Sequence, residues 1–294
     1  MYQFRLEDRA AFCIHNARMK WEIVHQTCYT YAAPVKNSFN EARLQPFSND
    51  QQTVEQFEIN VVPAARLRHY HDLYSNIVHH FEIIEPHSSL LVESKVRVTT
   101  HPPAFLPEDA VLWPLSRMGE ALRDTRTYEF VDESRYIELS PEAWRIAVDA
   151  TIDRVDTWQA ALALMRFVNQ HLEYLPNSTN VHTHMRRVLA ERRGVCQDFA
   201  HVMIGLCRAV KIPALYVSGY LATEKTSATH AWMEVFVPGL GWRALDPTHN
   251  CQAGENYVKI AIGRDYADVP PLTGFYQGTT DRTMEVDVKV LPLR

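Results

Sequence analysis

The chain has 294 residues, of which 46% are hydrophobic and 22% are charged. This length and composition can fill one large or two ordinary domains with packed cores, which excludes wholesale disorder. The net charge of −5 is mild and gives no support for nucleic-acid binding, which calls for a basic patch. No apolar run approaches the ~20 residues of a membrane-spanning helix, so no membrane association is expected.

The start of the chain carries charges throughout and shows no clean period, so it does not resemble a signal peptide. We expect residues 1–18 to be a flexible extension and the protein to be cytoplasmic. In that compartment the five cysteines should be reduced thiols. His182 and His184 bring two imidazoles together, but no further ligands stand at a recognisable spacing. No metal site and no other cofactor is therefore predicted.

Residues 19–102 have the pattern of an antiparallel β domain. Apolar and polar side chains alternate in several stretches, for example from Phe57 to Val61 and from Leu90 to Val98. Alternation with one polar face is typical of antiparallel strands that have one side in water. The first strand, from Trp21 to Tyr31, is expected to stop at Ala33-Pro34. Several strands within about eighty residues predict a small β-sandwich.

Residues 103–155 are interrupted by prolines and are interpreted as a connector with one short helix from Pro141 to Asp149. A second domain, 156–294, begins at Asp156, a plausible N-cap for a helix with an apolar stripe from Trp158 to Leu172. A short basic helix follows from His184 to Arg193. Its arginines could bind an acidic substrate, although a solvated helix face is the simpler interpretation.

The next helix begins at a cysteine. Apolar residues of one helical face stand at Phe199, Met203, Leu206, Cys207 and Val210, and Lys211-Ile212-Pro213 ends the helix. Cys196 therefore lies in the first turn, where unpaired N–H groups and the helix dipole favour a thiolate over a thiol. Gly194 predicts a close backbone approach just before it. Chemistry that needs a sulfur nucleophile would place a cysteine at this position.

Two later segments supply what a thiolate needs. Thr229 to Val237 is typical of a strand, Pro238 to Gly241 of a turn, and Trp242 to Asp246 of a returning strand. His230 can take the thiol proton and later deliver it to a leaving amine, and Asp246 can hold the imidazole in the right tautomer. The alternative is a buried structural cysteine with a hydrogen-bonded core histidine. It is less favoured because the three residues come together with a helix start and a hairpin.

The register of this hairpin decides whether the histidine and the aspartate can meet. A symmetric four-residue turn would point Asp246 and His230 to opposite faces of the sheet. A five-residue loop pairs Phe236 with Trp242 instead, and makes Asp246 the diagonal neighbour of His230 at ~7–8 Å between backbones. We therefore predict Phe236 opposite Trp242, with the two glycines of the loop in unusual backbone conformations.

Five stretches stand around these residues: Gly194-Val195-Cys196-Gln197-Asp198-Phe199-Ala200-His201, Ile212-Pro213-Ala214 with Val217-Ser218-Gly219-Tyr220, His230-Ala231-Trp232, Gly241-Trp242 and Leu245-Asp246-Pro247-Thr248. Together they resemble the bacterial transglutaminase-like family, whose members are often described as cysteine proteases. Residues between His25 and His87 also resemble the N-terminal domain that accompanies such cores. The resemblance implies an α+β fold with a papain-like transglutaminase core, in which a cysteine-bearing helix packs on an antiparallel sheet. It also implies Cys196, His230 and Asp246 as the catalytic triad.

The implied reaction is thiol-dependent acyl transfer or hydrolysis at a peptide or glutamine carboxamide, through a thioester on Cys196. A lysine amine would give cross-linking, and water would give deamidation or proteolysis; the shared triad leaves both open. A cytosolic setting favours hydrolysis, because uncontrolled cross-linking would be harmful there. The expected partner is a protein or peptide substrate, and no oligomeric state is predicted. A rival from another class is a catalytically silent peptide-binding module that retains the fold.

Overall fold

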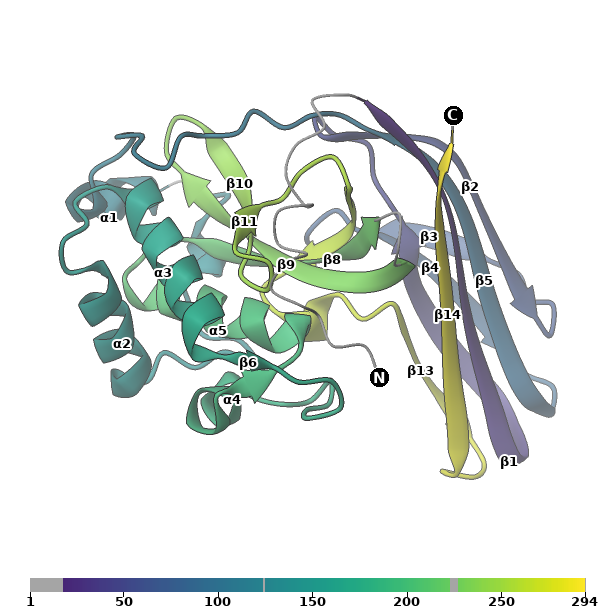
Figure 1. Ribbon diagram of the computed structural model, residues 1–294. Coiled ribbons are helices and arrows are strands. Elements are labelled where there is room, and N and C mark those ends of the chain that lie inside the picture. Colours follow the sequence, from purple (N-terminus) through teal and green to yellow (C-terminus); the bar gives the residue numbers. More distant parts are fainter. Residues whose placement is uncertain (1–17, 124, 223–226, 294) are drawn as a thin grey trace.

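The computed structural model describes residues 18–123, 125–222 and 227–293. The extension expected at residues 1–18 therefore lies, except for its last residue, outside the described residues. The N-terminal antiparallel sheet forms one end of the molecule, the second antiparallel sheet lies in the middle, and helices cover the second sheet at the other end (Figure 1). Within the described ranges, no helix has the length and apolar character needed to cross a membrane.

The N-terminal sheet is antiparallel, with the order β2-β5-β1-β4-β3 and with β13 and β14 also paired to β1. Its strands are β1 (Met19–Gln45), β2 (Gln52–Val62), β3 (Arg68–His71), β4 (Ile77–Ile83), β5 (His87–Thr100), β13 (Leu272–Gln277) and β14 (Arg282–Leu293). The first half of β1 pairs with β5 and β14, and its second half pairs with β4 and β13. An apolar cluster that includes Val35, Phe81 and Val92 packs the two halves together. This is the sandwich-like antiparallel domain that the alternation predicts.

The first strand does not end at Ala33-Pro34, as expected from the sequence. β1 continues to Gln45, and its pairing with β5 shifts register between Thr30 and Val35. Proline has no N–H to donate to a ladder, so it interrupts the pairing without ending the extended backbone. One long strand consequently serves both halves of the domain.

The last two strands differ from the expected division of the chain at residue 156. β14 pairs with β1 from Lys20 opposite Leu293 to Tyr31 opposite Arg282, and β13 pairs with the second half of β1. The C-terminal residues are therefore hydrogen-bonded into the N-terminal sheet. An alternating pattern identifies a strand, but it carries no information about which sheet the strand joins.

The second sheet is antiparallel in the order β11-β10-β9-β8-β12. Its strands are β8 (Ala214–Ala222), β9 (Ser227–Val237), β10 (Gly241–Asp246), β11 (Cys251–Gln252) and β12 (Tyr257–Gly263). The helices are α1 (Met118–Ala121), α2 (Pro141–Thr151), α3 (Thr157–His171), α4 (Met185–Glu191) and α5 (Cys196–Ala209), with 3₁₀ turns at Leu115–Arg117, Tyr128–Phe130 and Tyr266–Asp268. Two short parallel strands, β6 (Glu173–Tyr174) and β7 (Arg193–Gly194), lead into α5.

The helices form a layer around α5. Helix α5 packs against β9 and β8, and α2, α3 and α4 pack against α5 (Figure 1). Every residue from Gln197 to Arg208 is buried, so α5 is surrounded on all sides rather than on one apolar face. Asp156 caps α3 as predicted, since its side chain accepts from the N–H groups of Trp158 and Gln159. Helix α2, expected inside a connector, is part of this layer.

The two sheets share one core. A single apolar cluster contains Trp21 and Val98 from the N-terminal sheet together with Val258 of β12. The side-chain amide of Gln52 also exchanges two hydrogen bonds with the backbone of Lys259, at 2.7 and 2.8 Å. The N-terminal domain thus holds one edge of the second sheet in place.

Candidate active site

The cysteine stands at the first residue of α5. Oδ2 of Asp198 accepts from the N–H of Val195 at 2.8 Å and from the hydroxyl of Thr179 at 2.5 Å. The N–H of Asp198 donates in return to the carbonyl of Val195 at 2.9 Å. Across the part of the chain that the structure describes, the N–H groups of Cys196 and Gln197 have no acceptor. These two N–H groups lie at the positive end of the helix and are suited to hold an anion.

Gly194 makes this helix start possible, as the sequence predicts. A Cβ added at Gly194 would lie 2.5 Å from Cβ of Asp198, a separation that real Cβ atoms do not show. Only glycine therefore lets the Asp198 carboxylate fold back to the backbone ahead of Cys196. Burial raises the pKa of Asp198, opposed by the hydrogen bonds from Thr179 and Val195.

The β9–β10 hairpin has the predicted register. Trp242 is opposite Phe236, and the pairing continues towards Asp246 without a bulge. The Asp246 side chain therefore shares a face with His230 on the neighbouring strand. The alternative register required the Asp246 side chain to point away from the imidazole. The structure does not have that arrangement.

The loop is shorter than the predicted five residues, Val237 to Gly241, because its two end residues pair with each other. Val237 and Gly241 also pair, so Pro238, Gly239 and Leu240 alone connect the strands. Gly239 and Gly241 have φ angles of 84° and 82°, in the left-handed region that glycine tolerates and other residues avoid. The unusual backbone conformations predicted for the two glycines are confirmed.

The structure brings the three candidate side chains together. Nε2 of His230 lies 2.7 Å from Oδ2 of Asp246, and Cys196 lies close enough to the same imidazole to help raise its pKa. Since Nε2 faces Asp246, Nδ1 is the nitrogen left for the sulfur. Asp246 is fully buried and His230 is buried, whereas Cys196 is half-buried and a free thiol. Cys196 is therefore the most accessible of the three residues.

The electrostatics of the pair favour a charged imidazole. Burial on its own lowers the pKa of His230, but the charge and hydrogen bond of Asp246, together with Cys196, raise it to about 10. Burial also opposes the charge on Asp246, yet His230 and His249 hold the pKa of that carboxyl well below its usual range. The proton of this coupled pair therefore resides on His230 at neutral pH.

Donors surround the buried carboxylate of Asp246. Its Oδ1 accepts from the backbone N–H groups of Thr248 at 2.8 Å and His249 at 3.2 Å. Its Oδ2 accepts from His230, from Nδ1 of His249 at 2.7 Å and from the hydroxyl of Tyr257 at 2.8 Å. Sequence reasoning missed His249 and Tyr257. The proximity of His249 to Asp246 in the chain was a usable signal, but nothing in the pattern connected Tyr257 to this site.

Two protein-family models match this chain. The model of the bacterial transglutaminase-like N-terminal region matches residues 21–99, and that of the transglutaminase-like superfamily core matches residues 146–247. Uncharacterized protein ML0607 of Mycobacterium leprae is 32% identical over 282 residues, which cover 93% of this chain and 99% of that protein. The chain belongs to the bacterial transglutaminase-like family.

Two further proteins are similar to this transglutaminase-like chain. A crystal structure described as a “Putative Cysteine Protease” from Cytophaga hutchinsonii matches with a TM-score of 0.78 and 22% identity, over 95% of this chain and 92% of that one. The expected α+β fold with a papain-like core is thereby confirmed. A protein-glutamine gamma-glutamyltransferase of Pseudomonas aeruginosa is 37% identical over 68 residues, which are 20% of this chain and 10% of that protein.

Aromatic rings enclose the imidazole of this transglutaminase-like site. The ring of Trp232 lies 6.1 Å from that of His230 at an interplanar angle of 21°, and the ring of Tyr257 lies 6.0 Å away. Tyr174 of β6 packs 6.1 Å from Phe199, one turn after the cysteine. Burial first, and then the charges of Cys196 and Asp246, raise the pKa of Tyr174 to about 12. Its hydroxyl therefore keeps its proton at neutral pH.

His230, Asp246 and His249 are of the residue types that hold transition metals, and their ligand atoms lie within 4.8 Å of one another. Each nitrogen is, however, 2.7 Å from the same oxygen. Ligand atoms around a tetrahedral metal with bonds of about 2.0–2.1 Å stand farther apart, at roughly 3.3 Å. The geometry is that of a hydrogen-bonded cluster.

The other polar features singled out in the sequence have structural partners. Nδ1 of His182 lies 3.0 Å from the hydroxyl of Tyr136, and His184 caps α4, so they do not join as metal ligands. The basic helix carries surface ion pairs, which are Arg186 with Glu138 and Arg187 and Arg193 with Glu191. Their exposure favours the interpretation of a solvated helix face.

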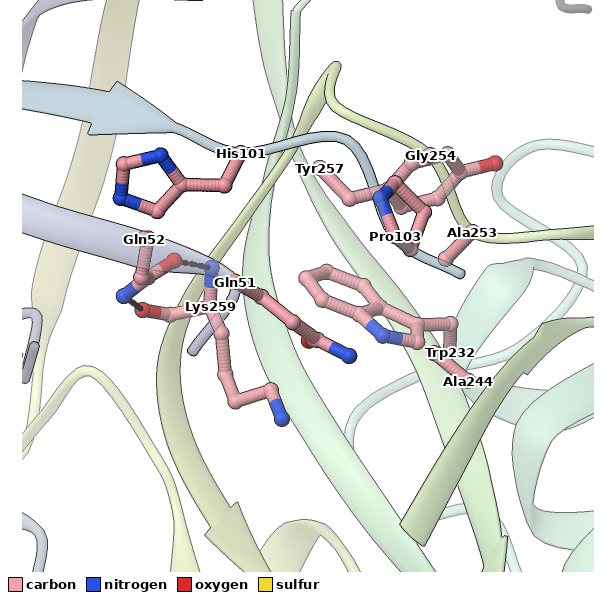
Figure 2. A pocket seen from close by; sticks show the side chains of 10 residues that line it. All are labelled: Gln51, Gln52, His101, Pro103, Trp232, Ala244, Ala253, Gly254, Tyr257 and Lys259. Atoms are coloured by element: carbon pink, nitrogen blue, oxygen red, sulfur yellow. Dashed lines mark hydrogen bonds between the residues drawn. The ribbon is translucent and has the colours of Figure 1, made fainter. Parts of the chain in front are cut away.

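A small pocket lies next to the site, between the N-terminal sheet and the core. Figure 2 shows Trp232 and Tyr257 on one side of it and Gln52 and Lys259 on another. Lys259 is paired with the buried carboxylate of Glu234. None of the three candidate catalytic residues lines this pocket. We therefore do not place the scissile carbonyl in this pocket.

Proposed function

We propose that this transglutaminase-like protein is an enzyme that cleaves or transfers the acyl group of a peptide bond or a glutamine carboxamide through Cys196. The supporting observation is the position of His230, which is hydrogen-bonded to Asp246 and lies close to Cys196. A protonated imidazole beside a sulfur at a helix N-terminus stabilises the thiolate, the form that attacks carbonyl groups.

In the first half-reaction, Sγ of Cys196 forms a bond to the carbonyl carbon, and the C=O electron pair moves to oxygen. The N–H groups of Cys196 and Gln197 are the donors placed to hold this oxyanion, because both project from the start of α5. When the tetrahedral intermediate collapses, the C–N bond breaks and the proton on His230 passes to the departing nitrogen. Ammonia or an amine leaves, and a thioester remains on Cys196.

In the second half-reaction, water or a primary amine attacks the thioester carbon. The neutral imidazole of His230 takes a proton from this nucleophile, the C–S bond breaks and the thiolate is restored. The product is a carboxylic acid when water attacks and a new amide when an amine attacks. Relatedness to a protein-glutamine gamma-glutamyltransferase supports the inclusion of glutamine carboxamides among the substrates.

The proposal is tested by incubating the protein with glutaminyl peptides and longer peptides, with and without a primary amine, and by analysing the products by mass spectrometry. Hydrolysis gives acid products in both conditions, and amine transfer gives an amide adduct only with the amine. Cys196→Ala is the inactive control, and Cys28→Ala, which removes another half-buried thiol, should behave as wild type. Absence of any product, combined with alkylation of Cys196 that is independent of His230, would favour a peptide-binding module.

A further inference from the structure

His249 holds both oxygens of the candidate catalytic carboxylate. Its ring Nδ1 lies 2.7 Å from Oδ2 of Asp246, and its backbone N–H lies 3.2 Å from Oδ1. The centre of its ring is 5.2 Å from that of His230. Its side chain is 18% exposed, whereas the Asp246 side chain is fully buried. His249 is thus the most exposed of the three side chains that donate to the carboxylate.

The turn that carries His249 is held from the helical layer. The side-chain amide of Asn169, in α3, donates to the carbonyls of Pro247 and Thr248 at 3.0 and 2.9 Å. Both carbonyls belong to the short segment between Asp246 and His249. Because this segment is anchored, the imidazole of His249 is preorganised against Oδ2 rather than free to swing into solvent.

One oxygen therefore serves three side-chain donors, namely His230, His249 and Tyr257. Each further donor takes up part of the negative charge of the carboxylate, so less of it remains to hold the proton on His230. A general acid that holds its proton too tightly is slow to give it to a leaving amine. The number of donors on this oxygen thus bears directly on the chemistry proposed above.

We propose that His249 is a positioning residue of the active site, which shares Oδ2 of Asp246 with His230 and thereby limits how firmly the carboxylate holds the catalytic imidazole. The inference rests on the proposed function. It assigns a role in the reaction to a residue that acts through Asp246 and does not touch the substrate.

The groups around His230 make the direction of the effect predictable. Asp246 faces it from β10, Cys196 from α5, His249 from the turn after β10 and Tyr257 from the start of β12. Burial and the charge of Asp246 raise the pKa of Tyr257, so its hydroxyl remains a neutral donor. When the donor at residue 249 is removed, more charge stays on Asp246 and the proton on His230 is held more firmly.

Two substitutions separate the hydrogen bond from the bulk of the side chain. His249→Asn keeps an N–H donor at the same number of bonds from the backbone as Nδ1, and His249→Leu keeps volume but no donor. The probe is iodoacetate, an anion whose attack on the Cys196 thiolate is favoured while His230 carries its positive charge. Peptide mass spectrometry must assign the label to Cys196, because Cys28 and Cys251 are also half-buried thiols.

In wild type, the rate at which iodoacetate labels Cys196 should fall at high pH as His230 loses its proton; this fall is the alkaline limb of the profile. For His249→Leu, we expect the alkaline limb to move to higher pH by roughly 0.5 to 1 pH unit, the equivalent of one neutral hydrogen bond. For His249→Asn, the limb should return towards the wild-type position. Tyr257→Phe, which removes the third donor from the same oxygen, should shift the limb in the same direction as His249→Leu. A purely structural role would lower the melting temperature without moving the limb.

A folded His249→Leu protein with an unchanged limb would overturn the inference. If His249→Leu does not fold, ¹⁵N NMR of the wild-type imidazoles decides, because Nδ1 of His249 must carry a proton while His230 titrates; a deprotonated Nδ1 contradicts the inference. If Cys196 is labelled at the same rate in His230→Gln as in wild type, the result would instead count against the proposed function.

Discussion

Nε2 of His230 and Oδ2 of Asp246 are 2.7 Å apart, although the two residues are separated by 16 positions and lie on different strands. The three-residue loop between β9 and β10 creates this proximity, because it pairs Phe236 with Trp242. A register shifted by one residue would turn the carboxylate to the other face of the sheet. The predictions below follow from this contact and from the helix start opposite it.

The three candidate catalytic residues should differ in how completely their loss stops turnover. Cys196→Ala and His230→Ala should abolish it, because one side chain forms the covalent bond and the other moves the proton. Asp246→Asn should lower it by about 10⁴-fold, since Asp246 orients and stabilises the imidazole without reacting. The peptide assay with mass-spectrometric detection measures this. Wild-type turnover in Cys196→Ala would show that the mechanism is wrong.

Truncation of the buried carboxylate should also destabilise the fold. Asp246→Ala leaves the buried His230 and the neighbouring His249 and Tyr257 without their shared acceptor, so we expect a loss of about 3–5 kcal/mol in the free energy of unfolding. Denaturant titration measures it. Asp153→Ala, which removes an exposed carboxylate, is the matched control and should stay within about 0.5 kcal/mol of wild type. Equal stabilities of the two variants would contradict the described burial of Asp246.

The stabilisation that the His230–Asp246 pair provides should fade on the alkaline side. The pKa of His230 is raised in the folded state from 6.5 to about 10. Its contribution is therefore fully present below about 6.5 and is lost as the pH rises through about 10. The difference in unfolding free energy between wild type and His230→Gln should shrink over this window. A difference that stays constant or grows with pH would refute the charged state assigned to the imidazole.

The tight hairpin loop should be sensitive to a side chain at Gly241. Its φ angle of 82° is unfavourable for other residues, and the space around it is open, so strain alone is tested. We expect Gly241→Val to cost about 1–2 kcal/mol in the free energy of unfolding. Gly119→Ala, in α1, meets no neighbour and has an ordinary backbone, so it serves as the control and should be neutral or slightly stabilising. Equal melting curves for the two variants would mean that the loop has another conformation.

Gly194→Ala should disturb the start of α5 and the reactivity of Cys196. The new Cβ would meet Cβ of Asp198 at 2.5 Å, and the carboxylate would have to leave the N–H of Val195. We expect a cost of about 1–3 kcal/mol and slower alkylation of Cys196. At Gly254 a new Cβ makes only ordinary contacts, the nearest at 3.4 Å, so Gly254→Ala is the control. Unchanged alkylation in Gly194→Ala would argue against this role for Asp198.

Local chemistry made much of this protein predictable from its sequence. The stop signals and apolar spacing around α5, the cap at Asp156 and the glycines of the hairpin each depend on nearby residues alone. The register at Phe236 and Trp242 was also predictable, because strand alternation and the requirement that His230 meet Asp246 left one consistent loop. These features depend on residues that are close together in the chain, so they can be predicted from the sequence alone.

Only the tertiary structure decided which distant segments meet. β14 joins the N-terminal sheet because β1 offers it a complementary edge, and an alternating pattern does not specify its partner. Tyr257 reaches Asp246 from a strand that is not adjacent to β10, and Asn169 anchors the turn of His249 from α3. Hydrogen bonds between such segments depend on how sheets and helices stack after the chain collapses. The sequence by itself therefore determined the three side chains of the candidate site, and the packing of the whole molecule decided what surrounds and tunes them.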